Sequence, residues 1–284
     1  MGDYLIRTIA KEAGVRLLVA TSKELAQEAA TNHETTPVAT AVLAEALTGA
    51  ALIGATLKIQ HRIAMKFESD GPLQKILVES DAYGRVRGYV GIPQPAQVDA
   101  NPLGHVGLLT VVKDVRLKEL VESVVPTAGE TIAQELTLYL NQSEQIPSHM
   151  SIGVSLHKDG TVAAAGGVLI QALPPYQPGA VQQLVDRLQE LPPIEAMLES
   201  GRTPEQIVAD IYGDIEHDIL ETRTIQFQCR CSWDRSAQAL ITLGRQEIEH
   251  LIEEGEAVVT CPFCHKSYVF DQDALEDLLL ELDE

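Results

Sequence analysis

The chain has 284 residues, 45% of them hydrophobic, which is enough for one large domain with its own core and a smaller domain beside it. Its 21 basic and 41 acidic residues give a formal net charge of −20, and aromatic residues make up only 4%. Binding to nucleic acid or to an anionic membrane surface requires clustered Lys and Arg, so the composition argues against both partners. We expect a soluble globular protein.

The first fourteen residues contain neither the continuous apolar stretch nor the small-residue cleavage site of a secretory signal. We therefore expect a cytoplasmic protein, in a reducing compartment where cysteines more often bind metals or take part in redox chemistry than form structural disulfides. Residues 37–57 are about long enough to cross a membrane. Because Glu45 lies near the centre of this stretch, and Ala, Thr and Gly make up much of it, we predict a buried helix instead.

The N-terminal part of the chain mixes helix and strand signals, and we expect helix to precede sheet. Thr36 and Pro37 form a plausible N-cap and first residue of the Ala-rich helix. The later signals are, in chain order, a strand at 62–68, a hairpin at 76–91 that turns at Gly84, a strand at 107–112, a helix at 131–140 and a hairpin at 150–173 that turns at residues 158–160. Residues 1–179 are thus predicted to form an α+β core domain whose sheets consist mainly of hairpins.

Residues 172–180 contain three prolines and a glycine, which interrupt regular structure and indicate a domain edge. The charge changes at the same place, because residues 1–180 carry a net −4 and residues 181–284 a net −16. Residues 180–228 have mostly helical periodicity, and Thr203 to Gln206 form a capping box with proline at the first helical position. This segment is either a helical subdomain whose apolar stripes simply pack, as such stripes usually do, or a metastable linker whose stripes can be uncovered.

All four cysteines lie in two close pairs, Cys229 with Cys231 and Cys261 with Cys264. Thiolates suit tetrahedral zinc, and a short loop that carries two cysteines supplies two ligands at little entropic cost. We therefore predict that the four cysteines bind one Zn²⁺ ion in the reduced protein. Residues 229–284 then form a small zinc-binding domain that depends on its metal for folding.

Regular elements are also predicted within this small domain. Residues 257–260 and 267–270 resemble the strands of a hairpin around the second cysteine pair. Short helices are expected at 236–243, at 245–252 and from about residue 271 or 273 to 280, with Gly244 and Gly255 ending the first two.

The zinc site has two interpretations, a permanent structural site and a redox switch. Without metal, Cys229 and Cys231 can close a very small and strained ring, and strained disulfides tend to be labile. Thiolates held by zinc are already deprotonated, so peroxide or hypochlorite can attack them and expel the metal. His265 could replace one thiol, but four cysteines already complete the coordination sphere.

Catalytic functions find little support in the sequence. A thioredoxin-type role for Cys261 and Cys264 does not fit, because the pair lies between two strand-like segments and has a second cysteine pair nearby. The chain contains no phosphate-binding, dinucleotide-binding or serine-hydrolase motif. We expect a protein that is not an enzyme.

The sequence around the cysteines resembles the zinc-binding end of the redox-regulated heat-shock protein 33 family, the 33 kDa chaperonins. The resemblance rests on residues 229–232, 239–240, 261, 264 and 268–270. Similar strings lie upstream, at residues 71–73, 86–89, 142–147 and 165–167, with Gln171 and Pro174. The likeness extends over nearly the whole chain, and none of the four cysteine positions departs from the family pattern.

The resemblance implies an ATP-independent cytosolic chaperone of bacterial type that is idle when reduced and zinc-bound. Oxidation would pair Cys229 with Cys231 and Cys261 with Cys264, release zinc and destabilise the linker at residues 180–228. The exposed apolar surface would then hold unfolded or oxidatively damaged client proteins. The oxidised form would be a homodimer, and downstream refolding chaperones would receive the clients after reduction.

Two other functions remain open on the residues alone. The chain could carry a permanent structural zinc module and act as an enzyme or a partner-binding adaptor. It could also be a zinc-ribbon nucleic-acid binder, but the net charge of −16 lies on the very segment that would bind.

Overall fold

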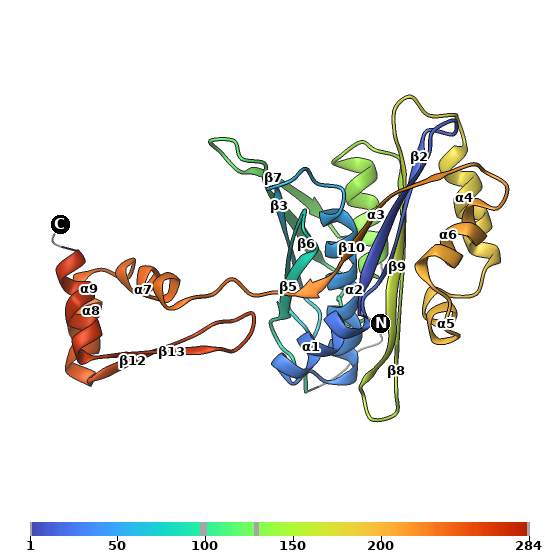
Figure 1. The fold of residues 1–284 in the computed structure, drawn as a ribbon. Coiled ribbons are helices and arrows are strands. Elements are labelled where there is room, and N and C mark those ends of the chain that lie inside the picture. Colours follow the sequence, from blue (N-terminus) through green and yellow to red (C-terminus); the bar gives the residue numbers. More distant parts are fainter. Residues whose placement is uncertain (1, 97–100, 128–130, 283–284) are drawn as a thin grey trace. The chain divides into compact units, whose positions relative to one another are not determined.

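The computed structural model describes residues 2–96, 101–127 and 131–282 (Figure 1). The chain divides into two units, Met1–Gln228 and Cys229–Glu284. The described strands of the first unit are β1 (Tyr4–Ala10), β2 (Val15–Thr21), β3 (Arg62–Ser69), β4 (Lys75–Asp81), β5 (Arg85–Val90), β6 (Gly107–Asp114), β7 (Val121–Pro126), β8 (Ser148–Leu156), β9 (Val162–Ala172), β10 (Asp218–Thr224) and β11 (Gln226–Phe227). Its described helices are α1 (Lys23–His33), α2 (Pro37–Gly54), α3 (Ile132–Gln142), α4 (Ala180–Glu190), α5 (Ile194–Glu199) and α6 (Pro204–Tyr212).

Two sheets organise this unit. The first has five antiparallel strands in the order β10-β1-β2-β9-β8. The second has the order β11-β5-β4-β3-β6-β7, and only the short β11 joins it in parallel. The predicted hairpins at 76–91 and 150–173 are present as β4–β5 and β8–β9, and the prediction of an α+β fold rich in hairpins is confirmed.

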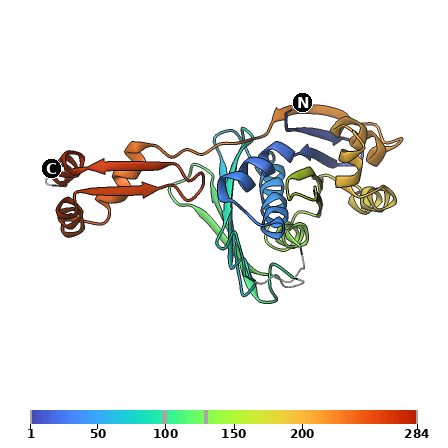
Figure 2. The same ribbon diagram turned by 90° about the horizontal axis from the view of Figure 1, so that it is seen from below.

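Helices α1 to α3 lie between the two sheets, where one core joins residues from all these layers (Figure 2). Helix α2 is apolar on nearly every side because it packs on both sheets. It begins at Thr36 and Pro37 as predicted. Among the described residues it is the one helix long and apolar enough to cross a membrane, and 78% of it is buried inside the protein. These contacts account for its hydrophobicity as a core helix.

Helices α4 to α6 cover the opposite face of the five-stranded sheet (Figure 2). The sheet alternates its side chains between two cores, so that Leu17 and Val19 face these helices while Leu18 and Ala20 face α2. The helices contribute to this second core Ala180, Leu184, Val185, Leu188, Ile194, Met197, Ile207, Val208, Ile211 and Tyr212. The predicted helical periodicity of this segment is thus present up to Tyr212.

Two expectations about element order are wrong. Strands β1 and β2 precede the first helix, whereas the sequence pattern predicted helix before sheet. Residues 218–227, expected to be mostly helical, form β10 and β11. Strand β10 pairs with β1 along its length, from Tyr4 opposite Thr224 to Ile9 opposite Asp218. Pairing with a strand about two hundred residues earlier overrides a weak local preference.

The second unit consists of α7 (Trp233–Ile241), α8 (Arg245–Glu254), the hairpin β12 (Glu256–Thr260) and β13 (Ser267–Asp271), and α9 (Gln272–Glu281). Its helices pack on one face of the hairpin around Ile248, Phe270 and Leu275, which are fully buried. Val258 and Val269, which pair across the strands, lie on the exposed face. The core is small, as expected for a unit of this size.

Sulfur is distributed unequally between the units. All four cysteines belong to the second unit. The described methionines, Met65, Met150 and Met197, lie in the first unit and are 0%, 3% and 1% exposed.

Candidate metal centre

The four cysteines lie in the two loops of the second unit that precede its first helix and join its two strands. Cys229 and Cys231 lie between β11 and α7, just before Ser232, which caps α7 by accepting a hydrogen bond from the Arg235 backbone N–H at 3.2 Å. Cys261 and Cys264 lie in the turn between β12 and β13. All four residues predicted as ligands are therefore carried by short loops with well-defined ends.

The turn that carries the second pair is held by its own backbone. Cys261 N–H donates to the Lys266 carbonyl at 3.0 Å, and His265 N–H donates to the Cys261 carbonyl at 2.9 Å. His265 has a φ of 55°, the left-handed conformation that lets the chain reverse at this point. This geometry directs both cysteine side chains to the same side of the turn.

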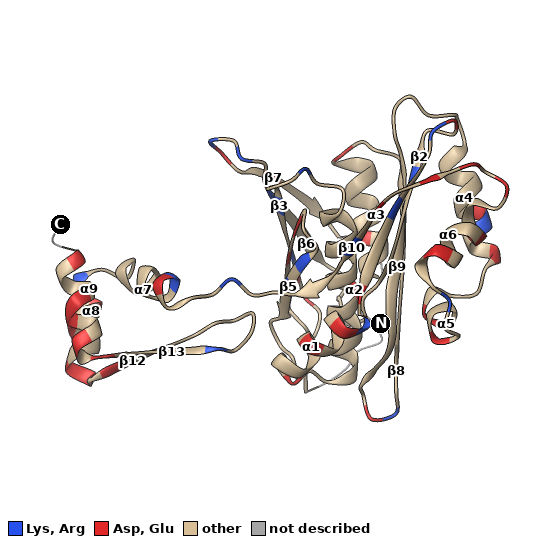
Figure 3. Ribbon diagram, in the orientation of Figure 1, with Lys and Arg blue, Asp and Glu red and all other residues tan. Residues whose placement is uncertain are grey.

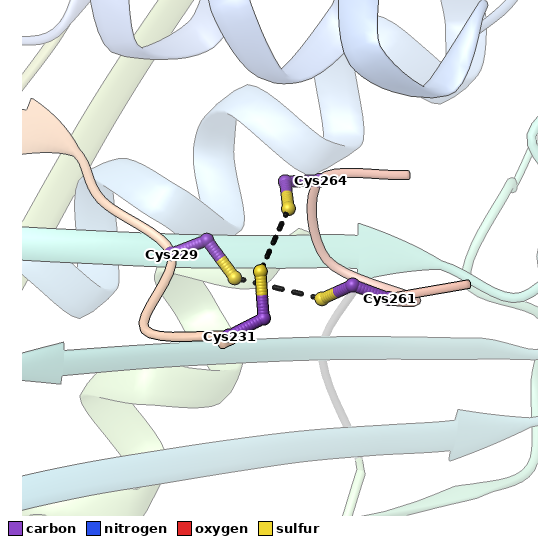
Figure 4. A group of neighbouring side chains, drawn as sticks. All are labelled: Cys229, Cys231, Cys261 and Cys264. Atoms are coloured by element: carbon purple, nitrogen blue, oxygen red, sulfur yellow. Dashed lines mark hydrogen bonds between the residues drawn. The ribbon is translucent and has the colours of Figure 1, made fainter. Parts of the chain in front are cut away.

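The two loops bring the four sulfur atoms together, all within 4.8 Å of one another (Figure 4). Cys229 Sγ lies 3.5 Å from Cys261 Sγ, and Cys231 Sγ lies 3.4 Å from Cys264 Sγ. A tetrahedron with metal–sulfur distances of about 2.3 Å has sulfur–sulfur edges of about 3.8 Å. The donor set and its dimensions therefore fit one tetrahedral Zn²⁺ ion. His265 is not among the converging ligand groups.

Each of these two short contacts joins sulfur atoms of different loops. The disulfides that the resemblance implies, Cys229 with Cys231 and Cys261 with Cys264, would each form within one loop. Because all four sulfur atoms lie within 4.8 Å of one another, small movements can bring together either kind of pair. The within-loop pairing stays a prediction.

Burial shapes the acid–base behaviour of the second pair. It raises the pKa of the Cys261 and Cys264 thiols above the ordinary thiol value, although backbone N–H groups of the same turn oppose the effect. A dication bound among the sulfur atoms would supply the opposite charge that stabilises the thiolates. The cluster is therefore compatible with a metal ion that would share the charge of four sulfur ligands.

The surface charge of the second unit is unevenly distributed. Helices α8 and α9 carry many of its acidic residues (Figure 3). Three cations lie in or next to the cysteine loops, namely Arg230, Arg235 and Lys266. The cluster thus has a locally more positive surrounding than the rest of an acidic unit.

One polar contact of the cluster was not anticipated from the sequence. The hydroxyl of Tyr268, on β13, donates a hydrogen bond to Cys231 Sγ at 3.1 Å. The alternation of residues 267–270 predicts only that Tyr268 and Phe270 share a face of the strand. Which sulfur the hydroxyl reaches depends on how the two loops meet, and no local pattern encodes that meeting.

Comparison with known proteins extends over the whole molecule. The sequence profile described as "Hsp33 protein" matches residues 3–271. The 33 kDa chaperonin of Citrifermentans bemidjiense is 43% identical over 290 residues, covering 99% of this chain and 98% of that protein. The 33 kDa chaperonin of Geobacillus kaustophilus is 40% identical over 287 residues, covering 98% of each. The crystal structure of the 33 kDa chaperonin from Thermotoga maritima superposes with a TM-score of 0.89 at 31% identity, covering 100% of this chain and 99% of the other. The chain belongs to the Hsp33 family.

Proposed function

We propose that this protein is a redox-regulated, ATP-independent holdase that keeps unfolding or oxidatively damaged proteins from aggregating in the cytoplasm. Membership of the Hsp33 family supports a chaperone function. The observation that carries the regulatory part is the convergence of four sulfur atoms within 4.8 Å in a chain that has no other cysteine. In the proposed resting state, Cys229, Cys231, Cys261 and Cys264 hold one Zn²⁺ ion, which ties the two loops of the second unit together.

Oxidation proceeds on the thiolates themselves. One thiolate sulfur attacks an oxygen of hydrogen peroxide, so that an S–O bond forms, the O–O bond breaks and hydroxide leaves. A second thiolate then attacks the sulfenic sulfur, forms the disulfide and expels a second hydroxide. Each disulfide thus transfers two electrons from sulfur to the peroxide. We propose the pairs Cys229 with Cys231 and Cys261 with Cys264, after which no thiolate remains to hold the metal.

The cysteine cluster is connected directly to the first unit along the chain. Gln228, the residue after β11, donates its backbone N–H to the Val86 carbonyl of β5 at 2.8 Å, and Cys229 follows immediately. Just before it, Phe227 packs against the core between the sheets. We propose that unfolding of the second unit loosens this anchored end and then the segment 180–228.

The surface that this loosening would uncover is apolar. Helices α4 to α6 cover Ile6, Val15, Leu17, Val19, Val168 and Ile170, which form the face of the five-stranded sheet in the second core. Uncovered, these residues would present a contiguous hydrophobic surface of the kind that holds unfolded chains. In this proposal the oxidised form is a homodimer. After reduction, refolding chaperones receive the clients that it held.

The test compares two redox states of the same chain. A chemically unfolded client protein is diluted into reduced, zinc-loaded protein and into peroxide-treated protein at elevated temperature. Light scattering follows aggregation, and a chromogenic chelator follows released zinc. We expect only the oxidised sample to suppress aggregation, with suppression rising in step with zinc release.

The main alternative is a permanent structural zinc site. If zinc stays bound under peroxide, or if its loss brings no protection, the redox proposal is wrong and the metal has only a structural role. A variant with Cys229 and Cys231 both replaced by serine provides a control, because it cannot form the disulfide between these two positions.

A further inference from the structure

Tyr268 places a phenol hydroxyl beside one sulfur atom of the cysteine cluster. It lies on β13 opposite Val259 of β12, and its ring is buried in the core of the second unit. The hydroxyl donates to Cys231 Sγ at 3.1 Å. Lys266 Nζ lies 5.2 Å from the centre of the ring and holds it by a cation–π contact. Packing, strand pairing and this contact together fix the direction of the hydroxyl.

The second cysteine pair has donors of a different kind. Backbone N–H groups of Phe263 and Cys264 are directed to Cys261, and the backbone N–H of Lys266 is directed to Cys264. These donors are part of the turn and no side-chain substitution removes them. The contact between Tyr268 and Cys231, by contrast, can be removed by deleting one oxygen atom.

A hydrogen bond to a thiolate withdraws electron density from the lone pairs that attack an oxidant. It also orients the sulfur toward the metal, as outer partners of metal ligands commonly do. We propose that Tyr268 is a positioning residue that slows attack by peroxide on Cys231 and so raises the oxidant level at which the cluster loses zinc. This inference rests on the proposed function, because it concerns how readily the same four thiolates are oxidised.

The chemical step is the one written above, with Cys231 as the attacking thiolate. Its sulfur takes an oxygen atom from hydrogen peroxide, hydroxide leaves, and Cys231 becomes a sulfenic acid. The Tyr268 hydroxyl neither gains nor loses a proton in this step. It only occupies a lone pair that must turn toward the peroxide for the S–O bond to form.

The test measures zinc release from the full-length reduced protein as a function of peroxide concentration, for wild type and Tyr268→Phe. The initial rate of zinc release is plotted against peroxide concentration at a fixed protein concentration. The slope is proportional to the bimolecular rate constant of oxidation, and the intercept is the rate of spontaneous zinc loss. We expect Tyr268→Phe to raise the slope about threefold to tenfold, the factor that one hydrogen bond is worth. The intercept should stay near the wild-type value.

A purely structural role for Tyr268 would give the opposite pattern. Removing the hydroxyl would then loosen the zinc site, raise the intercept and leave the slope unchanged, and the inference would be overturned. Ser267→Ala is the matched control, because it removes the hydroxyl contact of 3.0 Å with Thr260 on the same hairpin without touching a sulfur atom. Its slope and intercept should both match wild type.

A second readout locates the first oxidation. A reagent that traps sulfenic acids, followed by mass spectrometry of peptides, should find a larger share of adduct on Cys231 in Tyr268→Phe than in wild type. An unchanged share would contradict the inference. Failure of the proposed function is separate, because it would show as wild-type protein that releases no zinc under peroxide or gives no protection after release.

Discussion

Glu45 is an acidic residue in the middle of the most apolar helix, and the structure explains how it is tolerated. It lines a cavity of 720 Å³ between α2, α3 and the second sheet, together with Phe67 and Glu135. Burial raises the pKa of Glu45 from 4.5 to about 7, although a hydrogen bond from the Ile132 backbone opposes the change. The side chain is therefore largely protonated in mildly acidic solution, which lowers the cost of placing it there.

This shift makes stability depend on pH in a defined direction. Because the folded protein binds the Glu45 proton more tightly than the unfolded chain does, the free energy of unfolding falls as pH rises from 4.5 to about 7. The shift corresponds to about 3 kcal/mol. We expect Glu45→Gln to remove this part of the pH dependence and to be more stable than wild type at pH 8, as measured by urea unfolding between pH 5 and 8.

Glu119→Gln is the control, since it changes the net charge equally at an exposed position. Equal pH slopes for wild type and Glu45→Gln would show that Glu45 does not titrate in this range. The sequence alone predicts that the Glu45 helix is buried, because a central acid opposes membrane insertion. It does not predict the cavity, since the walls of that cavity come from segments far apart in the chain.

The same contrast holds at the metal site. The spacing of the four cysteines predicts their convergence, because thiolates in two short loops have few other uses in a reducing compartment. The contact of Tyr268 with Cys231 could not be predicted. It depends on the register of β12 with β13 and on where a separate loop approaches them.

At the scale of elements, helices α3 and α6 both begin with a capping box but lie in different surroundings. Thr203 caps α6 by accepting from Gln206 N–H, while the Gln206 side chain accepts from Thr203 N–H at 2.9 Å. Thr131 and Gln134 form the equivalent capping box on α3. Helix α6 covers the outer face of the five-stranded sheet, whereas α3 belongs to the core between the sheets. A change in the cap of α6 therefore tests the stability of the covering helices, and a change in the cap of α3 tests the stability of the core between the sheets.

We expect Thr203→Ala and Thr131→Ala each to destabilise their own helix by about 1 kcal/mol. Of these two helices, only α6 belongs to the segment that leaves its sheet in the proposed mechanism. Thr203→Ala should therefore lower the temperature at which peroxide-treated protein suppresses client aggregation. Thr131→Ala should leave that temperature unchanged. Light scattering across a temperature series measures both, and an equal effect of the two variants would contradict a specific role for the covering helices.

The capping box of α6 is visible in the sequence because its signal is local, four residues long. Strand β10 is not, because Ile219 and Leu220 are about half exposed and the alternation is weak. Strand β10 pairs with β1, and an ion pair between Arg7 of β1 and Glu221 of β10, 3.1 Å apart, also joins the two strands. Long-range pairing of this kind lies outside any short sequence window.

At the scale of the whole molecule, the two units differ in what holds them together. The first has two extended cores around its sheets, whereas the second has one small cluster and the cysteine loops. The change in charge near residue 180 does not coincide with the division into units after Gln228. The change in charge reflects where acidic residues become frequent. The division into units instead reflects the contacts that α4 to α6 and β10 make with the five-stranded sheet.

Removing the metal should therefore act on one unit first. We expect a strong chelator, added to reduced protein, to abolish hydrogen-exchange protection in residues 233–281 while strands β1 to β9 stay protected. Added Zn²⁺ should restore protection, and Mg²⁺, which prefers oxygen ligands, should not. Retained protection of α8 and β13 after complete metal removal would show that the small core suffices on its own.

The unequal distribution of sulfur gives the molecule a defined chemical vulnerability. Cysteine and methionine are the residues that oxidants damage most readily, and damage to methionine turns an apolar side chain into a polar one. In the described part of the chain the first unit has no cysteine, and its three methionines are shielded from solvent. An oxidant that meets the folded protein would therefore react first at the cysteines of the second unit, where any disulfide formed can be reduced again, and would spare the buried methionines of the first unit.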